Sequence, residues 1–173
     1  MNTSKSFSAD KLFGIAAFII GIGTFGVYIY EASLMRTQQY ASVLPYLELG
    51  SSNPGNGDYK LILANNGLGP AFVREIRVRY KAKTYEGDHA HFHYTVIQPK
   101  DTVFNIGYTN VQPGRLIPAG QMIELIIVQG NPASGAKASS LYGSQEARLE
   151  IVYASVYDEK WKITGMAPPQ KLE

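Results

Sequence analysis

The sequence predicts an all-β domain, an antiparallel β-sandwich, preceded by one N-terminal transmembrane helix. An apolar run from Leu12 to Tyr30 contains no charge, proline or amide. From Val43 onward, short runs rich in valine, isoleucine and tyrosine alternate with turn residues. The composition agrees, because 17 glycines, 9 prolines and 12 tyrosines among 173 residues are typical of a chain with many short strands and turns.

The apolar run is long enough to cross a bilayer. As a helix, residues 12–30 would span about 28 Å, close to the thickness of the hydrocarbon layer. A cleaved signal peptide is the alternative, but its apolar region is shorter and ends before small residues, whereas tyrosines and Glu31 stand at that point here. We expect a retained helix that continues to about residue 40, because residues 31–40 contain no helix breaker.

The basic residues around the run set the expected topology. Lys5 and Lys11 precede it, and only Arg36 follows closely. The positive-inside bias then places the short N-terminus, residues 1–11, in the cytoplasm and the remaining chain on the outer side. The difference is a single charge, so an inverted topology with a cytoplasmic domain stays open.

Within the apolar run, small residues recur at helical spacing and form a seam on one face. The seam consists of Gly14, Ala17, Gly21 and Thr24. Membrane helices approach one another closely along such faces, although glycine is also common in membrane helices generally. The seam predicts packing on a second helix, from a membrane-protein partner or another copy of this chain.

The extramembrane domain is expected over residues 43–165, with a flexible tail over 166–173. Its predicted strands cover residues 43–49, 59–64, 72–85, 89–97, 102–106, 122–129, 147–157 and 160–164. We interpret residues 131–144 as a mobile loop and residues 65–70 as a turn in which Gly67 and Gly69 supply positive φ angles. Seven or eight short strands without a soluble helix predict a sandwich of immunoglobulin-like type.

The predicted strand over 72–85 alternates strictly between apolar and basic residues. Its basic face comprises Arg77, Arg79, Lys81 and Lys83. Four positive charges on one face favour anionic lipid headgroups or an acidic partner. The alternative is a solvated face paired with carboxylates on a neighbouring strand, where Glu146 and Glu150 are available.

All three histidines lie within one short segment, His89, His91 and His93. On a strand, alternate residues share a face, so neighbouring imidazoles could converge on zinc or copper. The outer two would lie about 13 Å apart along the strand, so a further ligand from another element is needed. The alternative is a polar strand face opposite buried aromatic residues.

Two aromatic side chains flank a predicted hairpin, and a third lies within it. The three residues are Tyr153, Tyr157 and Trp161, with Asp158 and Glu159 at the tip. Large amphipathic side chains at this spacing predict a cap over one end of the sandwich. A ligand-binding aromatic patch is the alternative.

Two motifs together resemble a known group of proteins. They are Asn66 to Ala71 (NGLGPA) and Tyr153 to Trp161 (YASVYDEKW). The pairing resembles uncharacterised bacterial proteins with one N-terminal membrane helix and an extracytoplasmic immunoglobulin-like β-sandwich. The resemblance implies a fold, a single-pass topology and a place in the bacterial inner membrane with a periplasmic domain, and it implies no activity.

The remaining features exclude several functional classes. The chain has no cysteine, so disulfides, thiolate metal sites and thiol nucleophiles are absent. A net charge of +2 is too mild for a nucleic-acid binder. No serine lies in a nucleophile elbow and no phosphate-binding loop is present. We therefore expect no enzyme and no cofactor. The expected function is a membrane-anchored interaction or accessory-subunit module, with a metal- or small-ligand-binding envelope protein as the alternative.

Overall fold

The computed structural model describes residues 9–101 and 105–172, in two compact units that meet between Ala41 and Ser42. Within these residues the first unit is one helix, α1 (Ala9–Ser42), none of whose residues is buried. This is the one helix in the described chain that is long and apolar enough to cross a membrane, with a mean hydropathy of 2.2. A signal sequence near an N-terminus satisfies the same criterion.

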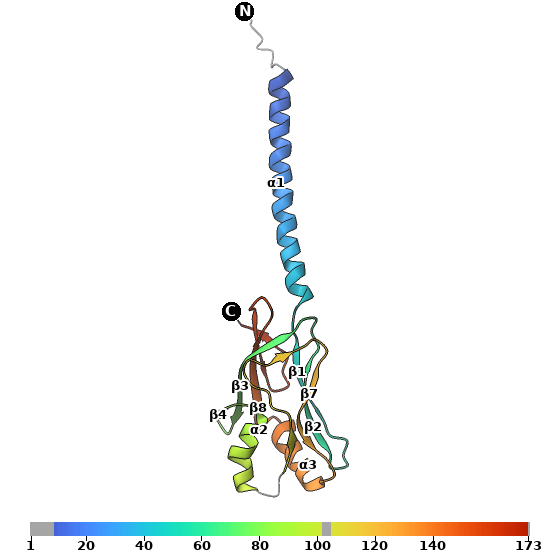
Figure 1. The fold of residues 1–173 in the computed structure, drawn as a ribbon, viewed down its shortest axis with the longest axis vertical. Coiled ribbons are helices and arrows are strands. Elements are labelled where there is room, and N and C mark those ends of the chain that lie inside the picture. The colour runs from blue at the N-terminus through green and yellow to red at the C-terminus, as the bar shows by residue number, and fades with distance from the viewer. Residues whose placement is uncertain (1–8, 102–104, 173) are drawn as a thin grey trace, which may run out of the picture. The chain divides into compact units, whose positions relative to one another are not determined.

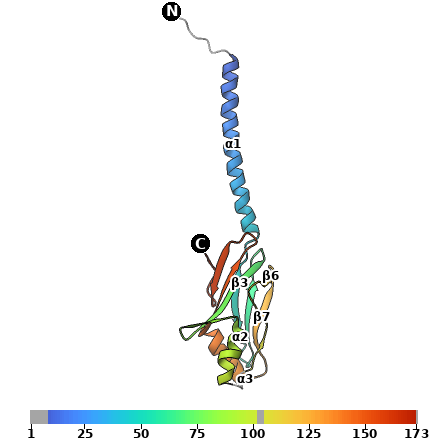
Figure 2. The ribbon, with the colours of Figure 1, turned by 60° about the vertical axis from the view of Figure 1, so that its left-hand side comes forward.

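The second unit contains two antiparallel sheets, visible in Figures 1 and 2. The first sheet has the order β1–β2–β7–β5. Its strands are β1 (Leu47–Ser52), β2 (Tyr59–Asn65), β7 (Met122–Val128) and β5 (Gly107–Tyr108). The second sheet has the order β10–β9–β8–β3–β4, with β6 also paired to β3. Its strands are β3 (Ala71–Tyr80), β4 (Lys83–Glu86), β6 (Leu116–Ile117), β8 (Ala147–Ala154), β9 (Lys160–Thr164) and β10 (Gln170–Lys171).

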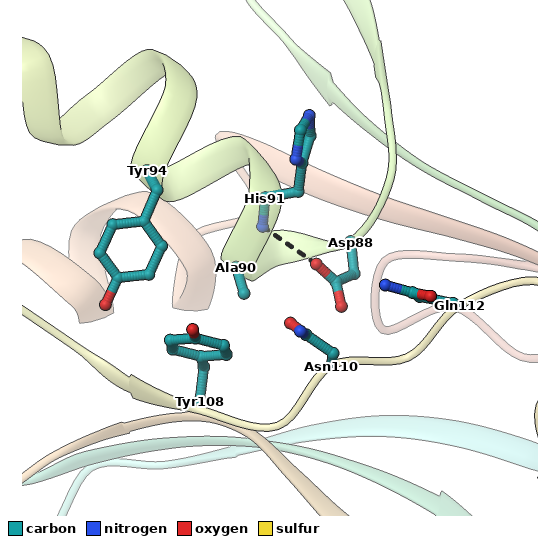
Figure 3. A pocket seen from close by; sticks show the side chains of 7 residues that line it. All are labelled: Asp88, Ala90, His91, Tyr94, Tyr108, Asn110 and Gln112. Carbon is teal, nitrogen blue, oxygen red and sulfur yellow. Dashed lines mark hydrogen bonds between the residues drawn. The ribbon is translucent and has the colours of Figure 1, made fainter.

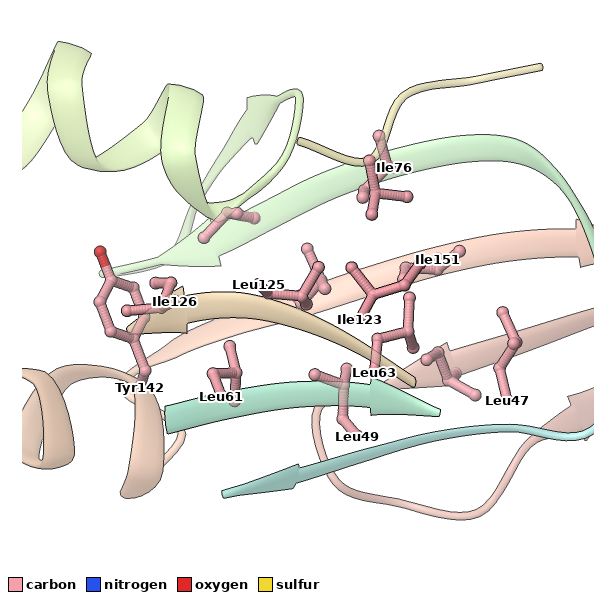
Figure 4. Close-up of a cluster of buried hydrophobic side chains, with 14 of the residues drawn as sticks. Leu47, Leu49, Leu61, Leu63, Ile76, Ile123, Leu125, Ile126, Tyr142 and Ile151 are labelled. Carbon is pink, nitrogen blue, oxygen red and sulfur yellow. The ribbon is translucent and has the colours of Figure 1, made fainter. Parts of the chain in front are cut away.

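The two sheets share one core of buried apolar side chains (Figure 4). Leu61 and Leu63 project from β2, and Ile151 projects from β8; each is at most 1% exposed. In β2 every second residue is buried, as expected for a strand with one face on a core. Two antiparallel sheets packed over a common core form the arrangement of a β-sandwich.

The segment predicted as a strand over residues 89–97 is helical, so that prediction is wrong. It forms α2 (His89–Phe92), a π-helical turn (His93–Ile97) and a 3₁₀ turn (Gln98–Lys100). Asp88 caps the first turn, because its Oδ1 accepts a hydrogen bond from the His91 amide at 3.0 Å. The buried residues His89, Phe92 and His93 follow the helical period of three to four residues.

The expected mobile loop over residues 131–144 is also helical. It contains α3 (Pro132–Ala138) followed by a π-helical turn (Ser139–Gly143). Asn131 caps α3 by accepting from the Ser134 amide at 3.0 Å, and Pro132 occupies the first turn. Gly135 packs directly on the loop before β2, because a Cβ there would lie 1.9 Å from the Gly57 carbonyl oxygen. Small residues therefore place α3 against the sheet.

The remaining strand predictions are mostly confirmed, with two corrections. The long strand over 72–85 divides into β3 and β4 at Lys81 and Ala82, whose φ angles are 47° and 62°. The tail is not free, because β10 pairs with β9. The predicted strand over 102–106 lies partly outside the described residues, and its described part, Asn105 and Ile106, is not in a strand.

Candidate functional site

The three histidines do not share a face. His89 and His93 point into the core and are 3% and 0% exposed, whereas His91 lies on the surface. The His93 Nδ1 lies 3.0 Å from the Tyr142 hydroxyl, and the His89 Nε2 lies 3.4 Å from the Ala147 carbonyl oxygen. Within the described residues no group of three histidine or acidic side chains could hold a metal ion. The strand geometry on which the metal site was predicted is therefore absent.

The two buried imidazoles form a polar cluster with Tyr142. The rings of His89 and Tyr142 meet edge to face, 4.8 Å apart between centroids. The His89 Nδ1 has no hydrogen-bond partner among the described residues. Burial lowers the pKa of His89 from 6.5 to about 4, and the contact with Ala147 opposes this only in part. Burial also raises the pKa of Tyr142. His89 is therefore a neutral core residue at physiological pH.

His91 lies at a polar hollow of about 230 Å³ on the surface (Figure 3). The lining residues are Asp88, Ala90, His91, Tyr94, Tyr108, Asn110 and Gln112. Both carboxylate oxygens of Asp88 are already engaged, because Oδ2 accepts from the Val111 amide at 2.7 Å and Oδ1 from His91. Asp88 thus joins α2 to the segment after β5. The lining offers amides and an imidazole for polar contacts but no serine, cysteine or lysine nucleophile.

The predicted basic face is only half present. Arg77 and Arg79 lie on one face of β3, but Lys81 and Lys83 lie at the turn into β4. The arginines contact the buried Glu150 of β8, Arg77 through Nε at 2.9 Å and Arg79 at 3.4 Å. The idea of four charges on one strand face is therefore wrong, and the alternative of pairing with a carboxylate on a neighbouring strand is confirmed for these two arginines.

Glu150 is the centre of this ionic cluster. Its side chain is 2% exposed, and Lys162 of β9 reaches it at 3.0 Å in addition to the two arginines. Burial alone would raise the pKa of Glu150, but hydrogen bonds from Lys162 and Arg77 outweigh it and lower the pKa below its ordinary value. The cluster links three neighbouring strands.

Of the three residues predicted to form an aromatic cap, two pack together in the structure. Tyr153 and Trp161 occupy paired positions on β8 and β9 and stack with centroids 5.9 Å apart. The Tyr153 hydroxyl accepts a hydrogen bond from the Leu47 amide at 3.3 Å, which joins the two sheets. Tyr157 lies outside this stack, in the loop between the strands, and is 46% exposed.

The helix seam Gly14, Ala17, Gly21 and Thr24 lies entirely within α1. No atom lies within 4 Å of the position that a Cβ would take at Gly14 or Gly21. The Thr24 hydroxyl donates to the Ile20 carbonyl at 2.8 Å, within the helix itself. Packing of a second helix along this seam stays a prediction.

Sequence reasoning did not identify a surface at the end of the sandwich where the chain enters β1, which we call the proximal end. The strand registers bring several loops together there. Leu47 lies opposite Asn65, Ala64 opposite Met122, and Phe72 opposite Ala154. The loops after β2, before β7 and after β8 therefore meet at the proximal end.

These loops expose large apolar side chains, which we call the proximal surface. Its members and their exposed fractions are Leu44 (38%), Leu68 (74%), Leu116 (46%), Val156 (47%) and Tyr157 (46%). The loops over residues 53–58, 129–131 and 144–146, at the opposite end, expose no large apolar side chain themselves, but Met166 (37% exposed) lies beside them and donates its amide to Gln145. Several large apolar side chains exposed at one end of a small domain make that end a candidate interaction surface.

The buried side chain of Asn65 holds the proximal loops in place. Its Oδ1 accepts from the amides of Tyr46 and Gly67, each at 3.1 Å. Its Nδ2 donates to the carbonyls of Gly69 and Ile117 at 2.9 and 3.0 Å. An asparagine side chain can make four such bonds, and all four are made here. Asn65 thus joins the segment before β1, the loop after β2 and strand β6.

The two glycines of the loop permit close backbone contact and do not adopt positive φ angles, so that expectation is wrong. A Cβ at Gly69 would lie 2.0 Å from the Val43 carbonyl oxygen, and one at Gly67 would lie 2.4 Å from that of Leu44. Leu68, between them, donates its amide to the Leu44 carbonyl at 2.9 Å. The tight loop therefore leaves the Leu68 side chain no place except the surface.

Together these features define a class of protein, a β-rich domain that follows a helix of membrane-spanning length and exposes large apolar side chains at its proximal end. No family model, no curated protein and no solved structure matches the chain. The resemblance to bacterial envelope proteins therefore stays a prediction.

Proposed function

We propose that the chain is a non-enzymatic, membrane-anchored interaction module whose proximal surface binds a partner membrane protein. On this proposal α1 is retained in the bacterial inner membrane, and the domain is an immunoglobulin-like sandwich on the outer side. The two antiparallel sheets and the length of α1 support this assignment. The resemblance noted above points the same way.

The observation that carries the proposal is the exposure of large apolar side chains at the proximal end, among which Leu68 is the most exposed. Leu68 is 74% exposed although its neighbours Gly67 and Gly69 are locked by backbone contacts. Asn65 makes the loop rigid, so a partner that binds Leu68 does not have to order it. A prearranged apolar surface of this kind is suited to protein contact.

The length of α1 favours a protein over lipid as the occupant of this surface. If residues 12–30 fill the hydrocarbon layer, the rest of the helix to Ser42 rises about 18 Å beyond it. The headgroup layer is only about 5–8 Å thick on each side, and an average helix tilt changes this height little. The start of the domain therefore stands above the acyl chains, at the level of protein that projects from the membrane.

The absence of cysteine allows a direct test of the proximal surface. Leu68→Cys gives the full chain a single attachment point for a maleimide cross-linker. In native membranes we expect a discrete adduct from Leu68→Cys and none from Glu146→Cys, which places the thiol in an exposed loop at the opposite end. An adduct of twice 19.0 kDa would identify the partner as a second copy.

A purification in mild detergent provides the complementary measurement. We expect the parent chain to retain a stoichiometric partner and Leu68→Glu to lose it, because a charge in the contact must be desolvated. Recovery of the chain alone from native membranes, or equal recovery of the partner with Leu68→Glu, would contradict the proposal.

The proposed topology predicts the behaviour of reporters fused after Glu173. Alkaline phosphatase, which needs an oxidising compartment, should be active there, and green fluorescent protein exported by the same route should be dark. The opposite pattern would place the domain in the cytoplasm, as the near balance of Lys5 and Lys11 against Arg36 allows.

A further inference from the structure

The geometry points to a second interaction site: the free edge of β1 is an acceptor for an extended segment of a partner polypeptide, which adds as a strand to the first sheet. β1 is the outermost strand of the order β1–β2–β7–β5. Its far side therefore presents main-chain groups that only another strand can pair in register.

The hydrogen-bond pattern identifies the open groups. The Asn66 amide donates to the Tyr46 carbonyl, so Tyr46 faces β2. Leu47 faces the other way, and its amide is bound by the Tyr153 hydroxyl. In an antiparallel pair the main-chain groups of successive residues point alternately toward the partner strand and away from it, so the amides of Leu49 and Ser51 also point away from β2. In the described part of the chain neither of these two amides has an acceptor.

β1 also lacks the features that commonly protect an edge strand. It contains no lysine, arginine or proline, and its register with β2 is unbroken over six pairs. The other edges in the described residues are shorter. β5 and β10 have two residues each, and β4 has four, with Lys83 and Glu86 at its ends. β1 is therefore the longest regular edge that an additional strand could join.

A hollow of about 320 Å³ beside the edge offers space for one side chain of the added strand. Ile62 and Ala64 of β2 lie on one side of it, and Gly50 of β1 lies between them and the open edge. No atom lies within 4 Å of a Cβ built at Gly50. A small or apolar side chain from the added strand can therefore cross Gly50 and enter the hollow.

The edge and the hollow together define the occupant. The outward main-chain groups of β1 pair with an extended backbone, and Ile62 and Ala64 beside Gly50 favour a small or apolar side chain from it. The occupant is therefore an extended segment of another polypeptide with alternating apolar side chains.

A phage-displayed library of random linear peptides, panned against the full chain in micelles, tests the inference. We expect enriched peptides with a period of two in apolar residues. Ser51→Pro removes an outward amide, and Gly50→Lys places a charged side chain at the edge. Each should weaken binding of a selected peptide by about tenfold or more, the equivalent of about one hydrogen bond. Gln170→Lys, the same charge on β10, should not.

Amide exchange supplies a readout independent of mutation. Leu49 and Ser51 should exchange fast in the free chain and slowly with peptide bound, while Gly50, which faces β2, stays slow in both. A library without enriched peptides, or peptides that bind Ser51→Pro and Gly50→Lys as tightly as the parent, would overturn the inference. Binding lost only in Leu68→Glu would also overturn it and would assign the peptides to the proximal surface, so the two proposals fail separately.

Discussion

Replacing Asn65 by alanine should destabilise the domain by about 4 kcal/mol, because four hydrogen bonds worth about 1 kcal/mol each are lost together. The carbonyls of Gly69 and Ile117 would remain buried without their donor. The loss can be measured by urea unfolding of the full chain in micelles. Trp161, the single tryptophan and only 8% exposed, reports the transition by fluorescence.

The neighbouring residue provides a matched control. Asn66 is exposed, and its side chain makes one bond, to a Glu48 carboxylate oxygen at 2.6 Å. Asn66→Ala should change stability by less than about 0.5 kcal/mol. Equal effects of the two substitutions would show that Asn65 does not organise the proximal loops. Because Asn65 fixes the loop that carries Leu68, Asn65→Ala should also reduce partner retention at temperatures where the chain is still folded.

Acidification from neutral pH should destabilise the chain through His89. In the folded chain burial holds the pKa of His89 near 4, whereas the unfolded chain takes up the proton near 6.5. Between these values the unfolded state binds more protons, so stability falls as the pH falls. The slope is about 1 kcal/mol per pH unit, and the total loss is roughly 3 kcal/mol. Urea midpoints from Trp161 fluorescence across this window measure it.

His89→Gln separates this contribution from those of other groups. The variant should be less stable than the parent at neutral pH but should lose about 1 kcal/mol less per pH unit between the two values. Glu150 acts at lower pH. Its pKa is lowered in the folded chain, so its charged form stabilises the fold fully above the pKa of the unfolded chain. That stabilisation is lost as the pH falls through the lowered pKa of the folded chain. An unchanged slope in His89→Gln would contradict the assignment.

Strand patterns in the sequence were reliable where a run of strand-forming residues lay between turn signals. Residues 59–64 are mostly apolar, residues 160–164 alternate between polar and apolar residues, and the two runs form β2 and β9. The pattern failed at His89 to His93, because alternating histidines fit a strand as well as a helix. The deciding signal was Asp88, a helix cap that could have been read from the sequence. Asn131 followed by Pro132 was the same signal before α3.

The candidate sites were less predictable than the strands. The basic stripe was inferred from alternation alone, and the turn at Lys81 and Ala82 contains no glycine to announce it. The proximal surface joins residues from four separate segments. Leu44, Val156 and Tyr157 lie within predicted strands, and Leu68 and Leu116 are single apolar residues among turn residues, so no local pattern groups them. Asn65 reads as one more turn residue in a run of turn residues. Asn65 holds the proximal loops because its side chain donates hydrogen bonds to the carbonyls of Gly69 and Ile117. Ile117 lies far along the chain, so the sequence does not show this contact.

The sequence alone determined the membrane-length helix and the predominance of β structure, because both depend on local hydrophobic pattern. Tertiary structure decided which polar residues are buried and which apolar residues are exposed. Asn65 and Glu150 can be buried because distant residues hydrogen-bond to them or pair with their charge. His89 can be buried because its imidazole is neutral. Leu68 is exposed because Gly67 and Gly69 fix its loop against the backbone of Val43 and Leu44. Such contacts between distant segments exist only once the chain has folded.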